Sequence, residues 1–460
     1  MIATSVAELA AAVGGELVDG NPTAVVNHVC SDSRQVRPGS LFVAVAGTRV
    51  DGHDYARGAV GAGAVAVLGS RATGAPTIVV PDVLLALGRL ARFHLDRLAN
   101  ITVVAITGSM GKTTAKDLTA DVLSGNGPTV SPPGSFNNEL GLPLTVLESD
   151  VDTRFLVLEM GARGLGHIAY LCEVAPPGIG VELSVGTAHV GEFGGQAAIA
   201  MAKAELVRAL PADGTAILHR DDPLVVAMAE ESPAQIVWFG LGSGADVTAT
   251  DVAPDEMDRA RFTLRTPEGS ASVALTYHGA HAVPNALAAA AVGHAVGMGA
   301  ADIAAGLNAA TPRSRWRMEV TERADGVTVI NDAYNASPES MRAALKSLKQ
   351  IAGDRRCWAV LGEMRELGDQ SVAEHDAIGR LVVRLDVQRL VVVGEGARPL
   401  QQAAALEGSW GQESIFVPDV EGALEVLREE LRAGDVVLVK ASRAAGLETV
   451  AEELVRGASA

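Results

Sequence analysis

The stretch AITGSMGKTTAKDLT, residues 105–119, decides the fold class of this chain. The apolar run at 101–107 is typical of a buried strand, and we expect a helix to begin near Lys112. Gly108 and Gly111 let backbone amides approach an anion closely, while Lys112 adds a positive charge and the helix N-terminus adds its dipole. A strand, a glycine-rich turn and a helix in this order predict a site for a nucleotide phosphate.

The loop differs from the common phosphate-binding pattern G-x-x-x-x-G-K-[ST], which would need glycine where this chain has Ile106. The ending Gly-Lys-Thr-Thr is retained, and Thr113 is placed to offer its hydroxyl to Mg²⁺. The alternative interpretation is a structural glycine turn that carries a surface lysine.

Composition limits the classes of partner. With 55 acidic and 37 basic residues the chain has a net charge of −18, and such a surface repels nucleic acid and anionic membranes. The N-terminus does not resemble a signal peptide, and no apolar run reaches the ~20 residues of a membrane span. Three widely separated cysteines, at positions 30, 172 and 357, suit buried reduced thiols. We therefore expect a cytoplasmic protein without nucleic-acid or membrane partners.

The 460 residues are too many for one ordinary core, and the alternation of apolar strands with helical patterns predicts an α/β protein of three domains. Residues 1–82 form a small N-terminal α/β domain. Residues 83–311 form a central parallel-sheet domain of the P-loop ATPase type, with 83–99 as a connecting helix. Residues 312–460 form a second doubly wound, Rossmann-like domain.

Three residues near the ends of central strands carry possible chemistry. Glu159 ends the apolar run FLVLE, His189 follows the next strand, and Lys203 lies in the helix after it. Ligands of open α/β sheets bind at this edge. Taken singly, each has another interpretation: a capping or solvated glutamate, a structural histidine, a solvated lysine.

Taken together, the same residues suit phosphoryl transfer. That reaction needs positive charge around the transferred group, so Mg²⁺ held by Thr113 and Glu159 beside Lys112 is chemically reasonable. A neutral imidazole at His189 is able to hold a second divalent ion.

The sequence resembles the Mur ligases, the ATP-dependent enzymes that add amino acids to the UDP-muramyl peptide of the cell-wall precursor. The family's shorter loop, TG-x-x-GKT, matches TGSMGKTT at 107–114. Other matching stretches span nearly the whole chain, among them SDSRQVRPGSLFVAVAG (31–47), FNNELGLPLTVL (136–147), EMGARGLGHIAYL (159–171), GTAHVGEFGG (186–195), GAHAVPNALAAAAV (279–292) and GDVVLVKASR (434–443). The stretches NDAYNASPES (331–340) and LGEMRELG (361–368) resemble those of the Mur ligases that add D-alanyl-D-alanine.

The resemblance implies a role for each domain and a set of site residues. The N-terminal domain would hold the UDP-sugar, the central domain ATP, and the C-terminal domain the incoming amine. The catalytic positions would be Lys112, Glu159, His189 and Lys203. Mg²⁺ would be bound by Thr113, Glu159, His189 and a carbamylated Lys203. ATP would be bound by Thr107, Gly108, Ser109, Met110, Gly111, Lys112, Thr113, Thr114, Asn285, Arg317 and Asp332. The UDP-muramyl substrate would face Ser31, Asp32, Ser33, Arg34, Asn137 and Asn138.

The resemblance further implies a monomeric enzyme that joins D-alanyl-D-alanine to UDP-N-acetylmuramoyl-tripeptide through an acyl phosphate, in peptidoglycan precursor synthesis. Alternatives are a related ligase that adds a different amine, a folylpolyglutamate-type ligase, and a regulatory ATPase that needs no acceptor. The chain departs from the family pattern at Met110, Ser184, His219, Ser337 and Ala441. Each change alters a group that could contact nucleotide or substrate, at a typical cost of ~1 kcal/mol per lost hydrogen bond.

Overall fold

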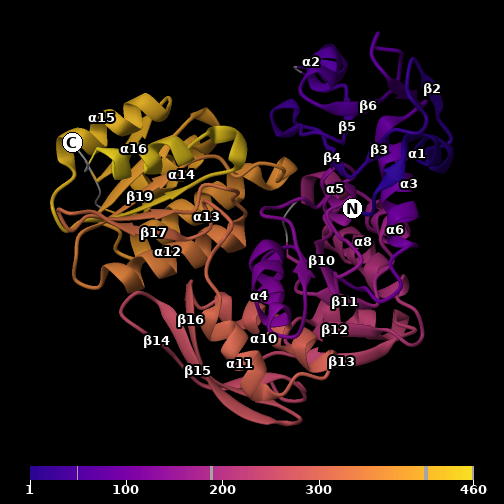
Figure 1. Ribbon diagram of the computed structural model, residues 1–460. Helices are drawn as coiled ribbons and strands as arrows, with labels where there is room; N and C mark the ends of the chain where they lie inside the picture. Colours follow the sequence, from indigo (N-terminus) through magenta and orange to yellow (C-terminus); the bar gives the residue numbers. More distant parts are fainter. Residues whose placement is uncertain (49, 187–189, 409–412, 458–460) are drawn as a thin grey trace.

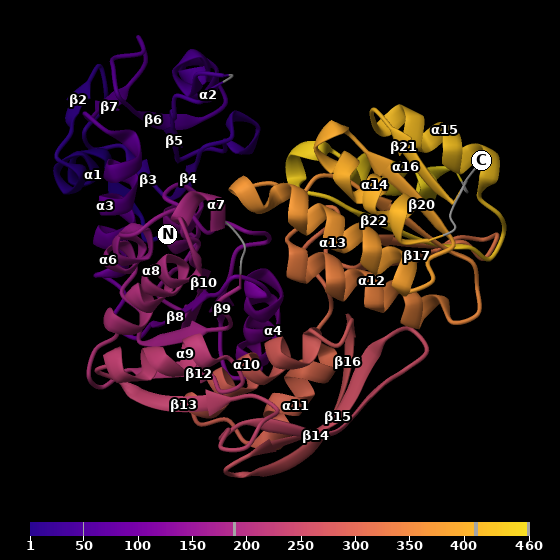
Figure 2. The ribbon, with the colours of Figure 1, turned by 180° about the vertical axis from the view of Figure 1, so that it is seen from behind.

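The structure is a computed structural model that describes residues 1–48, 50–186, 190–408 and 413–457. Figure 1 shows three parts, with the central part below an N-terminal part and a C-terminal part that stand apart from each other. Figure 2 gives the same arrangement from behind. Each part is built around its own main sheet, and the predicted three-domain α/β fold is confirmed.

The N-terminal part holds a five-stranded sheet in the order β2-β7-β6-β5-β4, in which only the β2–β7 pair is antiparallel. A second, two-stranded sheet pairs β1 with β3. The strands of this part are β1 (Thr4–Ser5), β2 (Glu16–Val18), β3 (Val25–Val26), β4 (His28–Cys30), β5 (Ser40–Val43), β6 (Ala64–Gly69) and β7 (Thr77–Val79). Its helices are α1 (Val6–Val13) and α2 (Ala56–Gly61), and α3 (Val83–Leu95) leads to the central part where a connecting helix was predicted.

The central sheet has six strands, all parallel, in the order β13-β12-β11-β8-β10-β9. Its strands are nearly continuous apolar runs, as expected where both faces of a sheet are covered. They are β8 (Thr102–Thr107), β9 (Thr129–Val130), β10 (Phe155–Glu159), β11 (Ile179–Glu182), β12 (Thr215–His219) and β13 (Gln235–Phe239). The helices are α4 (Lys112–Ser124), α5 (Gly141–Val146), α6 (His167–Val174), α7 (Val190–Phe193), α8 (Gln196–Arg208), α9 (Pro223–Ala227), α10 (Ala282–Ala295) and α11 (Ala300–Ala309).

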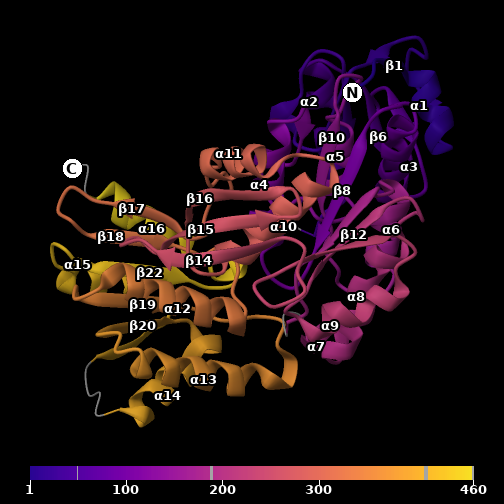
Figure 3. The same cartoon turned by 90° about the horizontal axis from the view of Figure 1, so that it is seen from below.

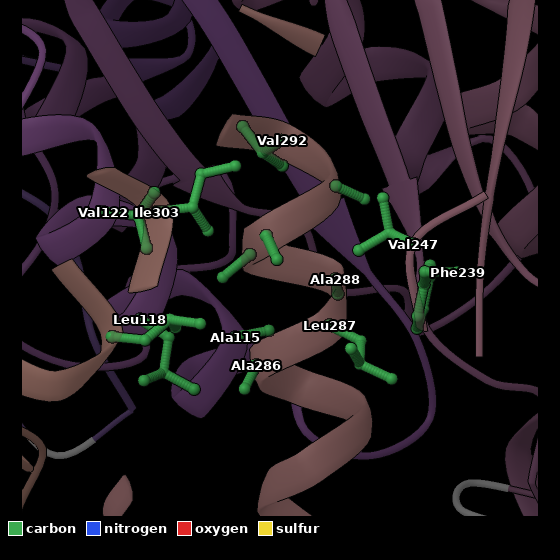
Figure 4. Packing of buried hydrophobic residues seen from close by; sticks show 14 of the residues in the cluster. Ala115, Leu118, Val122, Phe239, Val247, Ala286, Leu287, Ala288, Val292 and Ile303 are labelled. Atoms are coloured by element: carbon green, nitrogen blue, oxygen red, sulfur yellow. The ribbon is translucent and has the colours of Figure 1, made fainter. Parts of the chain in front are cut away.

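Three clusters of buried residues cover the faces of the central sheet, and the smallest packs α8 and α9 on β12. One joins α3, α5 and α6 to the N-terminal sheet, so the N-terminal and central parts share a continuous core. Another packs α4, α10 and α11 together (Figure 4). Helix α10 is rich in alanine, which allows close packing. Gly306 lies where α11 meets α4, and a Cβ at this position would lie 2.7 Å from the Cα of Val122. This packing fixes α4, the helix that follows the glycine loop.

The three-stranded antiparallel sheet β14-β15-β16 was not predicted from the sequence. Its strands are β14 (Thr248–Pro254), β15 (Arg259–Thr266) and β16 (Gly269–His278). Buried and more exposed residues alternate along β15, as they do in a strand with one covered face. The sheet lies against α10 and α11 (Figure 3), and Met257, in its first turn, packs on the C-terminal core.

The C-terminal sheet has six strands in the order β17-β18-β22-β19-β20-β21, with only β17 antiparallel to its neighbour. They are β17 (Glu319–Glu322), β18 (Thr328–Asn331), β19 (Cys357–Leu361), β20 (Arg389–Val393), β21 (Ser414–Val417) and β22 (Val436–Lys440). The helices are α12 (Pro338–Ala352), α13 (Ser371–Arg384), α14 (Arg398–Glu407), α15 (Val420–Glu430) and α16 (Glu448–Arg456). Short 3-10 helices are η1 (Ser33–Gln35), η2 (Gly52–Tyr55), η3 (Met228–Glu231), η4 (Gly368–Gln370), η5 (Glu395–Ala397) and η6 (Arg443–Ala445).

The three cysteines are free and buried, as the sequence predicts. Among the described residues, no helix is long and apolar enough to cross a bilayer. The domain boundaries placed at 82/83 and 311/312 remain predictions.

The contact between α11 and α4 makes a test of this packing possible. Gly306→Ala should lower the free energy of unfolding by about 1–3 kcal/mol, because the added methyl group collides with the backbone of Val122. Gly58→Ala on α2 is the control: a Cβ there meets nothing within 4 Å, and we expect no loss of stability. Chemical denaturation measures both variants, and equal behaviour of the two would contradict the close packing of α11 on α4.

Candidate active site

The glycine loop follows β8 and leads directly into α4, as predicted. Gly108 and Gly111 have φ angles of +149° and +82°, which residues other than glycine rarely adopt. A Cβ on Gly108 would lie 2.8 Å from the Cβ of Leu183, and one on Gly111 would collide with the side-chain oxygen of Asn285. Asn285, a predicted nucleotide-binding residue, therefore lies directly against the loop.

Lys112 curls over this loop. Its Nζ donates to the carbonyl oxygen of Gly108 at 2.7 Å. Burial lowers the pKa of Lys112 from its ordinary value, while the nearby carboxylate of Glu159 acts in the opposite direction. The lysine is thus held where its charge faces an anion bound by the loop.

Glu159 is buried at the carboxyl end of β10, with 1% of its surface exposed. One carboxylate oxygen accepts from the hydroxyl of Thr113 at 2.9 Å. The other accepts from the hydroxyl of Ser135 and the side-chain amide of Asn137, both at 2.8 Å. A buried carboxylate needs such donors, since an unpaired one would lose its hydration without compensation. The interpretation of Glu159 as a solvated residue is excluded.

The donor set fits Mg²⁺. Thr113 and Glu159 offer hydroxyl and carboxylate oxygens, the ligand type that Mg²⁺ prefers, and this ion commonly takes only one or two protein ligands beside phosphates and water. Among the described residues, no group of three or more His, Cys, Asp or Glu side chains could hold a metal by itself. A bound nucleotide would supply the missing oxygens. His189, the predicted ligand of a second ion, lies outside the described residues.

Lys203 is buried in α8, with 6% of its surface exposed, so it is not a solvated lysine. Burial lowers its pKa to about 7, and the nearby carboxylate of Glu182 opposes this shift. Glu182 is fully buried at the end of β11, and burial raises its pKa to about 7. Neither of its carboxylate oxygens has a hydrogen-bond partner among the described residues.

Glu182 was missed in the sequence analysis. The signal was the same as for Glu159: a carboxylate that ends an apolar strand, here GIGVE at 178–182.

The C-terminal part contributes the opposite wall of the site. The guanidinium of Arg317 lies over the ring of Tyr334, 4.1 Å from its centroid. Asp332 accepts from the ammonium of Lys440 at 2.6 Å and from the backbone amide of Met318 at 3.1 Å. Asp332 therefore already has partners in this structure, in addition to any ribose hydroxyl it would bind.

These residues line one cleft with a volume of about 530 Å³. It brings together most of the predicted site: Gly108, Ser109, Met110, Gly111, Lys112, Thr113, Thr114, Asn137, Asn138, Glu159, Lys203, Arg317 and Asp332. His281, Tyr334 and Lys440 also line it and were not predicted. Thr107 is buried beneath the loop and Asn285 beside it.

The predicted substrate motif at 31–34 does not line this cleft. Asp32 caps η1 and pairs with Arg34 at 2.7 Å, and this hydrogen-bonded pair lowers the pKa of Asp32 to about 2. Its role in binding substrate remains a prediction.

Four departures from the family pattern have structural roles. The Ser184 hydroxyl accepts from the Met110 amide at 3.4 Å, and its carbonyl accepts from the Ser109 amide at 2.8 Å. The ring of His219 stacks on Phe239 at 4.8 Å, and Ser337 caps α12. Ala441 is buried, and a Cβ on Gly362 would lie 2.8 Å from its Cβ.

Three family models match the chain in succession: "Mur ligase family, catalytic domain" at 25–94, "Mur ligase middle domain" at 106–293 and "Mur ligase, glutamate ligase domain" at 316–443. A UDP-N-acetylmuramoyl-tripeptide--D-alanyl-D-alanine ligase of Mycobacterium bovis is 49% identical to it, over 99% of this chain and 98% of the relative. The chain belongs to the Mur ligase family.

Solved structures agree with this membership. The Mur ligase chain superposes on MurF from Acinetobacter baumannii with a TM-score of 0.87 and 33% identity, over 99% of both chains. It superposes on the MurF ligase of Thermotoga maritima in complex with ADP with a TM-score of 0.79 and 30% identity, over 94% of this chain and 98% of that one.

The ion pair between Lys440 and Asp332 tests how the wall of the cleft from the C-terminal part is stabilised. Lys440→Met should lower the free energy of unfolding by about 3–5 kcal/mol, because it leaves a largely buried carboxylate without its cation. Arg428→Met is the control: Arg428 and its partner Glu421 are 57% and 65% exposed and lie 2.9 Å apart, so the loss should stay below about 1 kcal/mol. Chemical denaturation of both variants measures the difference, and similar losses would show that the Lys440 pair is not the stabilising contact described here.

Proposed function

We propose that this Mur ligase joins D-alanyl-D-alanine to UDP-N-acetylmuramoyl-tripeptide, with ATP cleaved to ADP and phosphate, in the synthesis of the peptidoglycan precursor. The observation that carries the proposal is the single cleft in which the glycine loop and Glu159 face Arg317 and Asp332 of the C-terminal part. The 49% identity to a relative named for this reaction, over nearly the full length, supports the choice of substrates.

We assign a role to each part of the chain. Residues 1–82 bind the UDP-muramyl group, with Ser31, Asp32, Ser33 and Arg34 facing it and Asn137 and Asn138 nearby. Residues 83–311 bind ATP, and residues 312–460 bind the incoming dipeptide. The enzyme works in the cytoplasm as a monomer.

The nucleotide would bind with its phosphates on the loop at 107–114. Backbone amides and Lys112 neutralise phosphate charge, and the N-terminus of α4 adds its dipole. Thr113 and Glu159 would hold Mg²⁺, which when bound neutralises further charge on the terminal phosphates. Asn285, Arg317 and Asp332 would hold the adenosine end, with Asp332 directed at the ribose hydroxyls.

Two transfers then complete the reaction. The terminal carboxylate of the tripeptide attacks the γ-phosphorus of ATP, which gives an acyl phosphate and ADP. The free amine of D-alanyl-D-alanine attacks the acyl carbon, and the tetrahedral intermediate expels phosphate to leave the amide. Lys112 stabilises the negative charge of both steps, and the walls of the cleft keep water from the acyl phosphate.

Lys203 suits the carbamylation proposed for it. Carbon dioxide reacts with the neutral amine, with release of a proton, and converts a cation into an oxygen ligand. Burial of Lys203 lowers its pKa to about 7, which makes the neutral amine available near neutral pH. The carbamate and His189 would then hold a second divalent ion.

Phosphate release with a panel of amines tests the proposal. With ATP, Mg²⁺ and UDP-N-acetylmuramoyl-tripeptide, D-alanyl-D-alanine should raise the rate at least about 100-fold over D-alanine, L-lysine or L-glutamate, since the cleft must position both ends of a dipeptide. Turnover with a single amino acid would indicate a related ligase with another amine. Rapid ATP hydrolysis without muramyl peptide would indicate a regulatory ATPase.

A further inference from the structure

Lys116 is a fully buried cation outside the residues assigned above. It lies on α4, one turn after Lys112, and none of its surface is exposed. Its ammonium group lies 2.7 Å from the carboxylate of Asp117 and donates to the carbonyl oxygens of Pro132 at 2.5 Å and Gly134 at 3.2 Å. These contacts match the three donors of an ammonium group.

The loop that accepts these hydrogen bonds has few backbone N–H groups with which to stabilise its own conformation. Its sequence is Ser-Pro-Pro-Gly-Ser, residues 131–135, and the two prolines have no backbone N–H to donate. Burying an ammonium group is costly unless it is paired and hydrogen-bonded. Here that group supplies the donors that anchor the loop to α4.

Two of the three side chains that donate hydrogen bonds to Glu159 lie at the end of this loop or just after it. Ser135 follows Gly134 directly, and Asn137 is two residues further. Both donate to one carboxylate oxygen of Glu159, and Asn137 also donates to Ser135 at 2.9 Å. Lys116 is therefore connected to Glu159 through one short segment of backbone.

The partner of Lys116 extends the connection to the C-terminal part. The second carboxylate oxygen of Asp117 accepts from the hydroxyl of Ser314 at 2.7 Å. Arg313, beside Ser314, pairs with Asp121 one turn further along α4. Residues 313 and 314 lie just before Arg317, which lines the cleft.

We propose that Lys116 is a positioning residue. It holds the loop at 131–135 so that Ser135, and Asn137 just after it, orient the Glu159 carboxylate toward Thr113. Asp117 fixes the ammonium of Lys116 and, through Ser314, ties the same unit to the segment that enters the C-terminal part. The consequence for cation binding rests on the proposed function, whereas the anchoring of the loop does not.

Hydrogen–deuterium exchange of the metal-free protein tests the anchoring. In Lys116→Met, the amides of Leu142 and Gly161, which donate to the carbonyl oxygens of Asn138 at 3.0 Å and Asn137 at 2.9 Å, should exchange about tenfold faster, while those of the C-terminal helix α12 should be unchanged. Lys346→Met is the control, because Lys346 is exposed on α12. Unchanged exchange of the Leu142 and Gly161 amides in folded Lys116→Met overturns the proposal. This measurement uses no substrate, so failure of the proposed function would not affect it.

Catalysis then tests the link to Glu159. Lys116→Met should raise the Mg²⁺ concentration for half-maximal activity about tenfold, as expected when support of a metal ligand is lost. Ser135→Ala should have an effect that does not add to that of Lys116→Met, since both act through the same carboxylate. Additive effects, or a loss of thermal stability with an unchanged Mg²⁺ requirement, would show that Lys116 is only structural.

If Lys116→Met does not fold, the double variant with Lys116→Met and Asp117→Asn takes its place in both measurements. Asp117→Asn removes the buried carboxylate that would otherwise be left without its cation, and methionine still offers no donor to the carbonyl oxygens of Pro132 and Gly134. Faster exchange of the Leu142 and Gly161 amides together with the higher Mg²⁺ requirement supports the proposal, and wild-type behaviour in both overturns it.

Discussion

The carboxylate of Glu159 is the group on which the site depends. It is buried, and its three hydrogen bonds come from two separate segments: Thr113 at the start of α4, and Ser135 and Asn137 from the loop after β9. A charge in such a place is stable only while these donors remain in position. The packing of α4 against α10 and α11 supplies that rigidity, and the strand β10 sets the depth of the carboxylate.

The cleft brings basic and acidic side chains close together. Burial lowers the pKa values of Lys112 and Lys203, and Glu159 and Asp332 are carboxylates with bound donors. Few of these charges face bulk water, so their interactions with a phosphate are weakly screened. The strongly acidic surface and a phosphate-binding cleft therefore coexist in one chain, because the local donors outweigh the diffuse field.

The sequence predicted what depends on local pattern. The loop at 107–114, Glu159 at the end of a strand and the three-part α/β fold all follow from spacing and apolar periodicity, and the resemblance implied that Asn285, Arg317 and Asp332 bind the nucleotide. It did not predict the antiparallel sheet β14–β16, because alternation of strands with helices indicates a parallel sheet. Nor did it predict Lys116, because a buried lysine is indistinguishable from a solvated one until its tertiary partners are placed. Glu182 carries the same signal as Glu159, a carboxylate that ends an apolar strand, and it was not predicted.

The most direct test of the account is binding of Mn²⁺, in place of Mg²⁺, to the enzyme with ADP, followed by electron paramagnetic resonance. The account predicts one tightly bound ion at the loop in the wild type and an affinity at least about 100-fold weaker in Glu159→Gln, which keeps the shape of the side chain but loses its charge. Equal affinity in the two proteins would contradict the claim that Glu159, held by Thr113, Ser135 and Asn137, organises the cation at this site.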